Sequence, residues 1–316
     1  MRRWIVLVLA AVLLACGGKG AAVGGEKKPD LDADPLALLP GSVVTVSSFE
    51  ARAVADLGAS GGAAGAELAG LAGKLLPFGE DAGFNASRDV DRVVLGSYAM
   101  GGADFVAVLT GRFDQAKIEA ATRAADGAPI VRGAYADRTT YAAAGGPVQC
   151  AVLTPRTAAA GSVEALRRLL DRVKAGELER SIPPWMADTI ETKGAQIAFA
   201  ADFSTQPIAA AAIGAVNLDW LKSLRLARAV GNFEAPGMNV AATLTYADPP
   251  HAQAAVEGVR VVDGWLKVLG PVLGGMRLQN LQVDADGADL RCKFALDDQA
   301  LRALLALSSR FIPNTP

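Results

Sequence analysis

The side chains able to perform covalent chemistry are few in this chain of 316 residues. Residues 58–62 read GASGG and match G-x-S-x-G, the pattern that presents a nucleophilic serine on a sharp strand-to-helix turn. The base would have to be His251, the single histidine. No strand is expected before Ser60, and His251 follows Asp248 at an expected helix start, where the helix dipole disfavours an imidazolium. The pattern therefore favours a flexible loop, and no catalytic residue is expected.

Three aspartates have the spacing of calcium ligands. Asp30, Asp32 and Asp34 match positions 1, 3 and 5 of an EF-hand loop. The sixth position of that loop needs glycine and the twelfth needs glutamate. The sequence has Pro35 and Gly41 there, so a solvated acidic linker is favoured and no metal site is expected.

Two cysteines, Cys150 and Cys292, lie on expected strands among apolar neighbours. One interpretation is a pair of buried thiols that act as small hydrophobic side chains. The alternative is a disulfide, which an oxidising compartment permits. A disulfide requires the two Cα atoms to lie within about 7 Å, and for that reason separated thiols are the favoured interpretation.

The N-terminus has the layout of a secretory signal peptide. Arg2 and Arg3 precede 12 apolar residues from Trp4 to Ala15. A bilayer-spanning helix needs about 20 apolar residues, so this run is too short to cross a membrane. Two basic residues, a short apolar core and then small residues are typical of a cleaved leader. Residues 1–15 are therefore predicted to be removed.

The end of the apolar run carries a more specific signal. Leu13-Leu14-Ala15-Cys16 resembles the lipobox of bacterial lipoproteins. The resemblance implies diacylglyceryl transfer to Cys16, cleavage after Ala15 and acylation of the new N-terminus, with palmitate as a typical chain. Gly17 stands where an aspartate would resemble an inner-membrane retention signal. The outer membrane is therefore favoured over the inner membrane.

Composition restricts the remaining functions. Loss of Arg2 and Arg3 leaves 31 − 2 = 29 basic residues against 33 acidic ones, a net charge near −4. Binding of nucleic acid requires a clustered basic face, so no nucleic-acid partner is expected. The glycine-rich residues 58–65 lack the preceding strand that a dinucleotide site needs, and no cofactor is expected.

The body of the chain repeats its own pattern. Residues 89–110 and 224–245 align without a gap and both predict a hairpin around a glycine-containing turn. Similar pairs flank them: 43–49 with 197–203, and 147–153 with 288–294. Helices are expected near 113–125, 162–175, 249–268 and 298–309. The first copy carries additional residues within 58–88.

The predicted fold class is therefore α+β, with two tandem copies of a β-α-β-β-α-β-β-α unit. We expect antiparallel sheets with helices packed on one face. The expected domains follow the signal peptide as a lipidated flexible tether (16–35), a first repeat (36–175), a linker (176–193) and a second repeat (194–312).

These features favour a membrane-anchored envelope lipoprotein with a non-catalytic binding or scaffolding role. Residues 38–46, LLPGSVVTV, also weakly resemble uncharacterised bacterial envelope proteins. Trp185, beside paired prolines in the linker, is the expected contact for an envelope protein partner. The first alternative is a periplasmic-face carrier of an apolar ligand or lipid, which requires a cavity of about 300–1,000 Å³. A hydrolase that depends on Ser60 is the less favoured alternative.

Overall fold

The computed structural model describes residues 30–54, 70, 72–99, 104–207, 219–234, 237–270, 275 and 277–302. Leu31 onward forms one compact unit. Among the described residues, no helix has the length and apolar character needed to cross a bilayer. Ala15, Cys16 and Ser60 lie outside the described residues.

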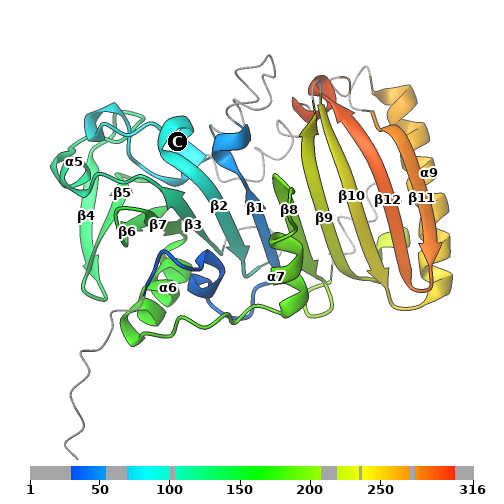
Figure 1. Cartoon of the computed structure of the whole chain (residues 1–316), viewed down its shortest axis with the longest axis horizontal. Helices are drawn as coiled ribbons and strands as arrows, with labels where there is room; N and C mark the ends of the chain where they lie inside the picture. Colours follow the sequence, from blue (N-terminus) through cyan, green and yellow to red (C-terminus); the bar gives the residue numbers. More distant parts are fainter. Residues whose placement is uncertain are drawn as a thin grey trace, which may run out of the picture. The chain divides into compact units, whose positions relative to one another are not determined.

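Within these described residues, the strands form a single antiparallel sheet of 12 strands in the order β11-β12-β10-β9-β8-β1-β2-β3-β7-β6-β5-β4 (Figure 1). The strands are β1 (Thr45–Phe49), β2 (Val90–Ser97), β3 (Phe105–Gly111), β4 (Ile130–Tyr135), β5 (Arg138–Ala143), β6 (Gln149–Val152), β7 (Thr157–Gly161), β8 (Ile197–Asp202), β9 (Leu224–Glu234), β10 (Gly237–Tyr246), β11 (Gln279–Asp286) and β12 (Asp289–Asp297). The α+β class is confirmed.

The two halves of the sheet are joined by β1 and β8. These strands pair antiparallel, with Val46 opposite Ala200 and Phe49 opposite Ile197. Each of the two strands therefore has a neighbour on both edges, and neither half ends in a free edge at the seam. The expectation of separate sheets is corrected to one continuous sheet.

Both predicted hairpins are present, formed by β2 with β3 and by β9 with β10. Their registers differ from the gapless alignment. Gly96 pairs with Val46, whereas Gly231 pairs with Ile197, which itself lies opposite Phe49. Val46 and Phe49 are three residues apart, so the two glycines are on opposite faces of the sheet. The glycines that the alignment matched are therefore not structurally equivalent.

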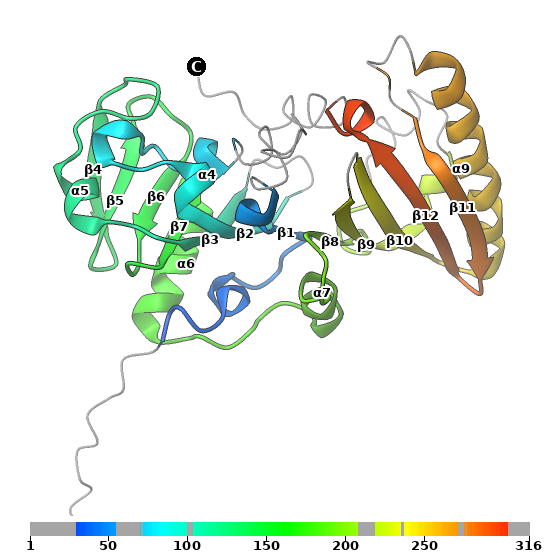
Figure 2. The same cartoon turned by 45° about the horizontal axis from the view of Figure 1, so that its top comes forward.

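Helices pack on both faces of the sheet rather than on one. The helices are α4 (Ala86–Asp89), α5 (Gln115–Ala120), α6 (Val163–Ala175), α7 (Pro184–Ile190) and α9 (Pro249–Leu269), with short 3-10 turns η1 (Pro35–Leu38), η2 (Glu80–Ala82) and η3 (Asp219–Leu221). Ala200 packs in the core of α6 and α7, but its neighbour Ala201 packs in the core of α9. Adjacent strand residues point to opposite faces, so α9 lies across the sheet from α7 (Figure 2).

Helix α6 forms where the apolar spacing predicts it. Ser162 Oγ accepts a hydrogen bond from the N–H of Ala165 at the N-terminus, and Gly176 ends the helix in the left-handed conformation with φ 74°. The buried face is Ala165, Leu166, Leu169, Leu170 and Val173. Burial of each such leucine stabilises the fold by about 1.5–3 kcal/mol.

The segment predicted as a linker contains a helix. Pro184 occupies the first turn of α7, where proline has no hydrogen bond to lose and its fixed φ suits the helix. The paired prolines therefore begin an element instead of interrupting one. Met186 is fully buried and joins the core beneath α6 and α7.

The sequence pattern missed one hairpin at the edge of the sheet. Strands β4 and β5 are connected by Ala136 and Asp137, with φ of 48° and 62°. Two-residue turns of this hand are usually signalled by Asn-Gly or Asp-Gly. An alanine in the left-handed region gives no such signal, and the first half therefore has two more strands than the predicted unit.

Candidate binding cleft beside helix α7

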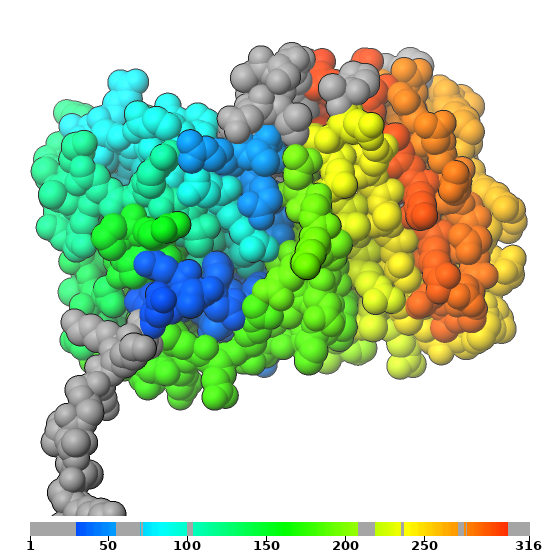
Figure 3. Space-filling model, viewed as in Figure 1, coloured from blue at the N-terminus to red at the C-terminus, as the bar shows by residue number. Residues whose placement is uncertain are grey.

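Beyond α7, no helix of the residues that the structure describes covers the second half of the sheet on the side that carries α6 and α7. Figure 3 shows β9 and β10 (yellow) and β12 (orange-red) at the surface beside α7. Side chains that point to this side, such as Arg228, Arg291 and Lys293, are exposed. This uncovered area is where a partner has direct access to the sheet.

A cleft of about 430 Å³ lies between α7 and this part of the sheet. One wall is the solvent side of α7. The floor and the other wall come from β9, β10 and β12. The lining residues that carry the argument below are Trp185, Thr189, Arg228, Ala241, Arg291 and Lys293.

The strand register arranges the floor of the cleft in rows. Thr243 of β10 pairs with Arg228 of β9 and with Arg291 of β12. The next row has Ala241 in the centre and Lys293 on β12. On β9 that row has Val230. Neighbouring strands are about 4.8 Å apart, so a trough of small side chains about 10 Å wide runs along β10, with Arg291 and Lys293 on one side and Arg228 on the other.

The cationic walls have exposed ion pairs at one end of the trough. Arg291 Nη2 lies 2.6 Å from Asp286 Oδ2, and Arg228 Nη2 lies 3.8 Å from Asp289 Oδ2. Surface pairs of this kind contribute about 0–1 kcal/mol. A carboxylate ligand can therefore replace either aspartate at little cost, since the guanidinium donors suit carboxylates.

Trp185, the residue expected to contact a partner, stands at the α7 wall of the cleft. Its ring is partly buried against the core beneath α7, and its carbonyl accepts a hydrogen bond of 2.8 Å from Thr189 Oγ1. The structure thus brings Trp185 together with three cations that the sequence analysis did not single out. Partner binding itself stays a prediction.

The trough continues beyond the cleft. A second hollow of about 340 Å³ lies over β9, β10 and β12 and is lined by polar side chains, among them Asn232, Asn239 and Gln282, together with Lys293. Lys293 and Ala241 line both hollows. The two form one elongated surface along β10.

A larger hollow lies elsewhere, in the first half, with a volume of about 1240 Å³. Apolar side chains of this hollow include Leu76, Phe78 and Phe84. Its lining also carries charged residues from several segments, namely Lys74, Glu80, Asp81, Arg88, Arg123 and Asp126. The lining therefore mixes apolar and charged surface.

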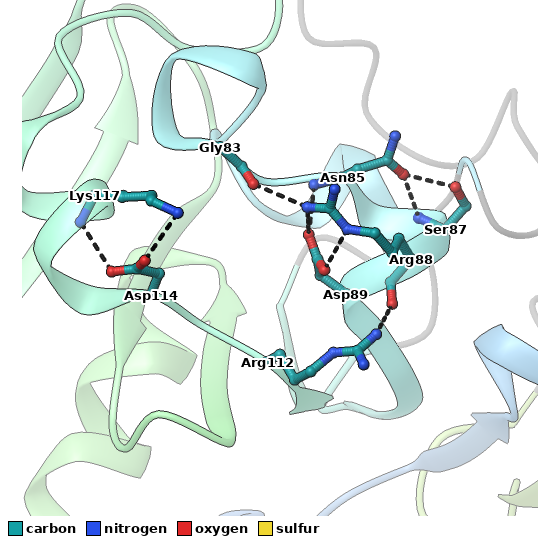
Figure 4. A network of polar contacts seen from close by, with 8 residues as sticks. All are labelled: Gly83, Asn85, Ser87, Arg88, Asp89, Arg112, Asp114 and Lys117. Carbon is teal, nitrogen blue, oxygen red and sulfur yellow. Dashed lines mark hydrogen bonds and ion pairs between the residues drawn. The ribbon is translucent and has the colours of Figure 1, made fainter.

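A compact polar network next to this hollow fixes the start of β2 (Figure 4). The carboxylate of Asp89 accepts hydrogen bonds from Arg88 Nε, at 2.8 Å, and from the backbone N–H of Asn85, also at 2.8 Å. Arg112 donates to the carbonyl of Arg88. Asp89 alternates with Asp91 in the sequence, as residues on the water side of a strand do, but it is buried. Both donors to this carboxylate come from within four residues, and Arg112 follows the end of β3, so the network is structural.

The histidine of the rejected hydrolase pattern has a local partner. His251 Nδ1 lies 2.6 Å from Asp248 Oδ1, and its backbone N–H donates to the same oxygen. These hydrogen bonds from the side chain and backbone of His251 hold the pKa of the Asp248 carboxyl below its ordinary value. Asp248 is the N-cap of α9, so the pair caps a helix.

Two of the aspartates with calcium spacing, Asp32 and Asp34, lie against the body. Asp32 Oδ1 accepts hydrogen bonds from the hydroxyls of Thr154 and Thr157, at 2.5 and 2.6 Å. Asp34 accepts a hydrogen bond of 2.6 Å from Arg180 Nε. Leu31 is buried as well. The end of the predicted tether, residues 31–35, is therefore docked on the body. No cluster of metal-ligating side chains occurs among the residues that the structure describes.

The thiols are separate, as expected. Cys150 and Cys292 are free and contact different apolar clusters, one on each half of the sheet. Cys150 is fully buried, and burial raises the pKa of its thiol well above the ordinary range. It acts as a small hydrophobic side chain.

Comparisons with known proteins identify a fold and no family. No family model matches the chain, and no curated protein matches it. Solved structures of TP0453, an envelope protein of Treponema pallidum, are similar at 11% identity. One crystal form gives a TM-score of 0.54 over 88% of this chain and 100% of that chain. A second gives 0.55 over 88% and 97%. At this identity the likeness is one of fold alone.

Proposed function

We propose that this chain is a membrane-anchored envelope lipoprotein with a non-catalytic binding role, and that the cleft beside α7 is its binding site. The observation that carries the proposal is the convergence of Trp185 with Arg228, Arg291 and Lys293 on a sheet face that, apart from α7, no described helix covers. Tryptophan and arginine are the residue types most enriched at binding hot spots.

The chemistry of the cleft suits an acidic segment of an envelope protein. Its lining carries three cations and one carboxylate, Asp188. Small side chains at Ala241 and Thr243 leave room for a chain or a helix about 10 Å across. A tethered body and its partner share one membrane surface, so a modest intrinsic affinity suffices.

A photo-crosslinking amino acid at Ala241 in the native bacterium tests this site. We expect a discrete adduct that is lost with Trp185→Ala and with Lys293→Glu, because these changes remove the aromatic wall and reverse one cationic wall. The matched control is the same photo-crosslinker at Lys222, next to η3, which packs on α9. An adduct that persists in both variants, or that forms equally from position 222, would contradict the proposal.

The carrier alternative keeps one observation in its favour, the hollow of about 1240 Å³ in the first half. Phe78 and Phe84 supply its aromatic surface and contact each other edge to face. Native mass spectrometry of the protein from its envelope distinguishes the two roles. A retained lipid that is lost with Phe78→Ala, in protein that remains folded, would favour the carrier.

The proposal includes the anchor and the duplication. Lipid at Cys16 would hold the body at a membrane, with the outer membrane favoured by Gly17. The strand order β8-β9-β10-β12-β11 follows the same path as β1-β2-β3-β7-β6, which supports a duplicated unit with an extra β4–β5 hairpin in the first copy.

A further inference from the structure

Helix α9 presents apolar side chains to solvent in its last turns. Val261 is 49% exposed, Trp265 is 46% exposed and Val268 is 77% exposed. Their spacing of four and seven residues places them on one stripe, which Leu269 borders. Four of the five large hydrophobic residues that are exposed in the described part of the chain belong to this segment. Clustered exposure of this kind marks an interaction surface.

The inward side of the same turns carries a carboxylate. Asp263 is buried, and its Oδ2 accepts a hydrogen bond of 2.6 Å from Lys267 Nζ. Its Oδ1 accepts no hydrogen bond from the residues that the structure describes. A helix that contacts only its own sheet turns its apolar side inward. Here the outward side is apolar, so we expect it to have a contact of its own.

Two glycines of α9 indicate what that contact is. A Cβ atom at Gly258 would lie 2.4 Å from Cδ1 of Trp220, so an indole of the chain itself packs directly on Gly258. A Cβ atom at Gly264 would have none of the neighbouring described residues within 4 Å. Gly264 therefore leaves an open notch in the stripe, immediately beside the exposed ring of Trp265.

We propose that a second copy of this chain covers the stripe, with the two α9 helices antiparallel. A twofold axis between positions 264 and 265 places Trp265 of each copy over Gly264 of the other. The same axis places Val261 of each copy against Val268 of the other. The stripe is thus complementary to itself, which a twofold interface requires. The packing of the Trp220 ring on Gly258 within one chain is an example of the contact proposed between Trp265 and Gly264.

A lipid surface fits these residues less well. A helix that lies in a membrane interface has a broad apolar face and a polar face rich in Lys and Arg. The apolar stripe of α9 is narrow, and Glu257, paired with Arg260 at 2.6 Å, lies in the turn that precedes it. The notch at Gly264 also adds no apolar surface that a bilayer could contact.

The membrane anchor determines whether this contact forms. The stripe involves a few side chains, whereas a stable interface buries about 800 Å² per partner. Confinement of two copies to one membrane raises their effective concentration, so we expect a dimer on a membrane. This inference uses the lipid at Cys16 and is independent of the cleft beside α7.

Disulfide cross-linking of the full-length lipoprotein in liposomes tests the axis. Chains with Val261→Cys and chains with Val268→Cys are prepared separately and also mixed, then oxidised mildly. Because the axis pairs 261 with 268, we expect the mixture to yield several-fold more cross-linked dimer than either variant alone. Equal yields in all three samples, or no cross-link in any, would overturn the proposal.

Three further variants separate this contact from the alternatives. Trp265→Ala and Gly264→Leu, added to the mixed sample, should each reduce its yield to that of the single variants. Val131→Ser is the matched control, since Val131 is 53% exposed on strand β4 and should leave the yield unchanged. If liposomes protect Val268→Cys from a water-soluble thiol reagent while no cross-link forms, the stripe contacts lipid and the proposal fails.

Discussion

At the scale of single residues, Asp89 is the charged side chain on which the first hairpin depends. Its burial raises the pKa of the carboxyl, but hydrogen bonds from Arg88 and from the N–H of Asn85 outweigh this, and the pKa lies below its ordinary value of 3.8. A carboxyl of lowered pKa stabilises the fold above its ordinary pKa, and this contribution is lost as pH falls through the lowered value.

Asp89→Asn should therefore destabilise the protein at pH 7 by about 1–3 kcal/mol, the cost of an unsatisfied buried group. The difference in the free energy of unfolding between the variant and the wild type should shrink once the pH falls below 3.8. Urea unfolding of both proteins across pH measures it. The control is Asp91→Asn, two residues along, which breaks an exposed pair with Arg52 and should cost less than about 1 kcal/mol. Equal losses would contradict the assignment.

The sequence could not separate these two aspartates. Asp89 and Asp91 alternate with Val90 and read as the polar side of a strand. In the structure the strand begins only at Val90, and Asp89 ends the short helix α4, whose N-cap is Asn85. A four-residue helix has too few residues to produce a 3.6-residue pattern, so no periodicity announces it.

At the scale of elements, helix α7 combines a stability role with the proposed binding role on adjacent residues. Met186 is fully buried, whereas Trp185 is partly buried and lines the cleft. Met186→Ala should lower the free energy of unfolding by about 2–5 kcal/mol, and Trp185→Ala by less.

The binding readout should follow the opposite order. The adduct from the photo-crosslinker at Ala241 should disappear with Trp185→Ala but persist with Met186→Ala at a temperature where that variant is folded. Urea unfolding and adduct yield, measured on the same preparations, check both expectations. Loss of the adduct in proportion to the loss of stability would mean that Trp185 acts only through the fold.

Long periodic elements were predictable, and the faces on which they pack were not. The leucine spacing of α6 and the Asp248-Pro249-Pro250 start of α9 gave both helices within a residue or two. The expectation that all helices share one face failed because β8 buries side chains on both faces, Ala200 in the core of α6 and α7 and Ala201 in the core of α9. The sequence shows small or apolar residues on both sides of β8, at Ala200 and Ala201, and this was the available signal.

The cleft was predictable only in part. Trp185 stands out because it follows Pro183 and Pro184. Arg228, Arg291 and Lys293 alternate with apolar residues and read as the solvated side of ordinary strands. Their meeting depends on β10 lying between β9 and β12, and that order is a long-range pairing that no local pattern encodes.

At the scale of the whole molecule, the lipid anchor that we propose at Cys16 would decide where every surface acts. Cys16→Ser should abolish incorporation of a palmitate analogue and leave the precursor uncleaved, because the thiol that accepts diacylglycerol is gone. Metabolic labelling followed by membrane fractionation measures both. Ala15→Leu offers a second test, since a large residue before the cysteine should block cleavage while Cys16 keeps its thiol. Labelling that survives Cys16→Ser would show that the lipid is attached elsewhere.

The docked end of the tether gives the molecule a mechanical property. Residues 31–39 follow the tether, and hydrogen bonds of Asp32 and Asp34 and the burial of Leu31 hold them to the body. The chain then reaches β1 in the centre of the sheet. Tension on the anchor would therefore act on these contacts of residues 31–39 before it acts on any strand. Detachment of these nine residues releases about 30 Å of chain. Under tension the tether would therefore lengthen first, and force would reach the paired strands β1 and β8 only afterwards.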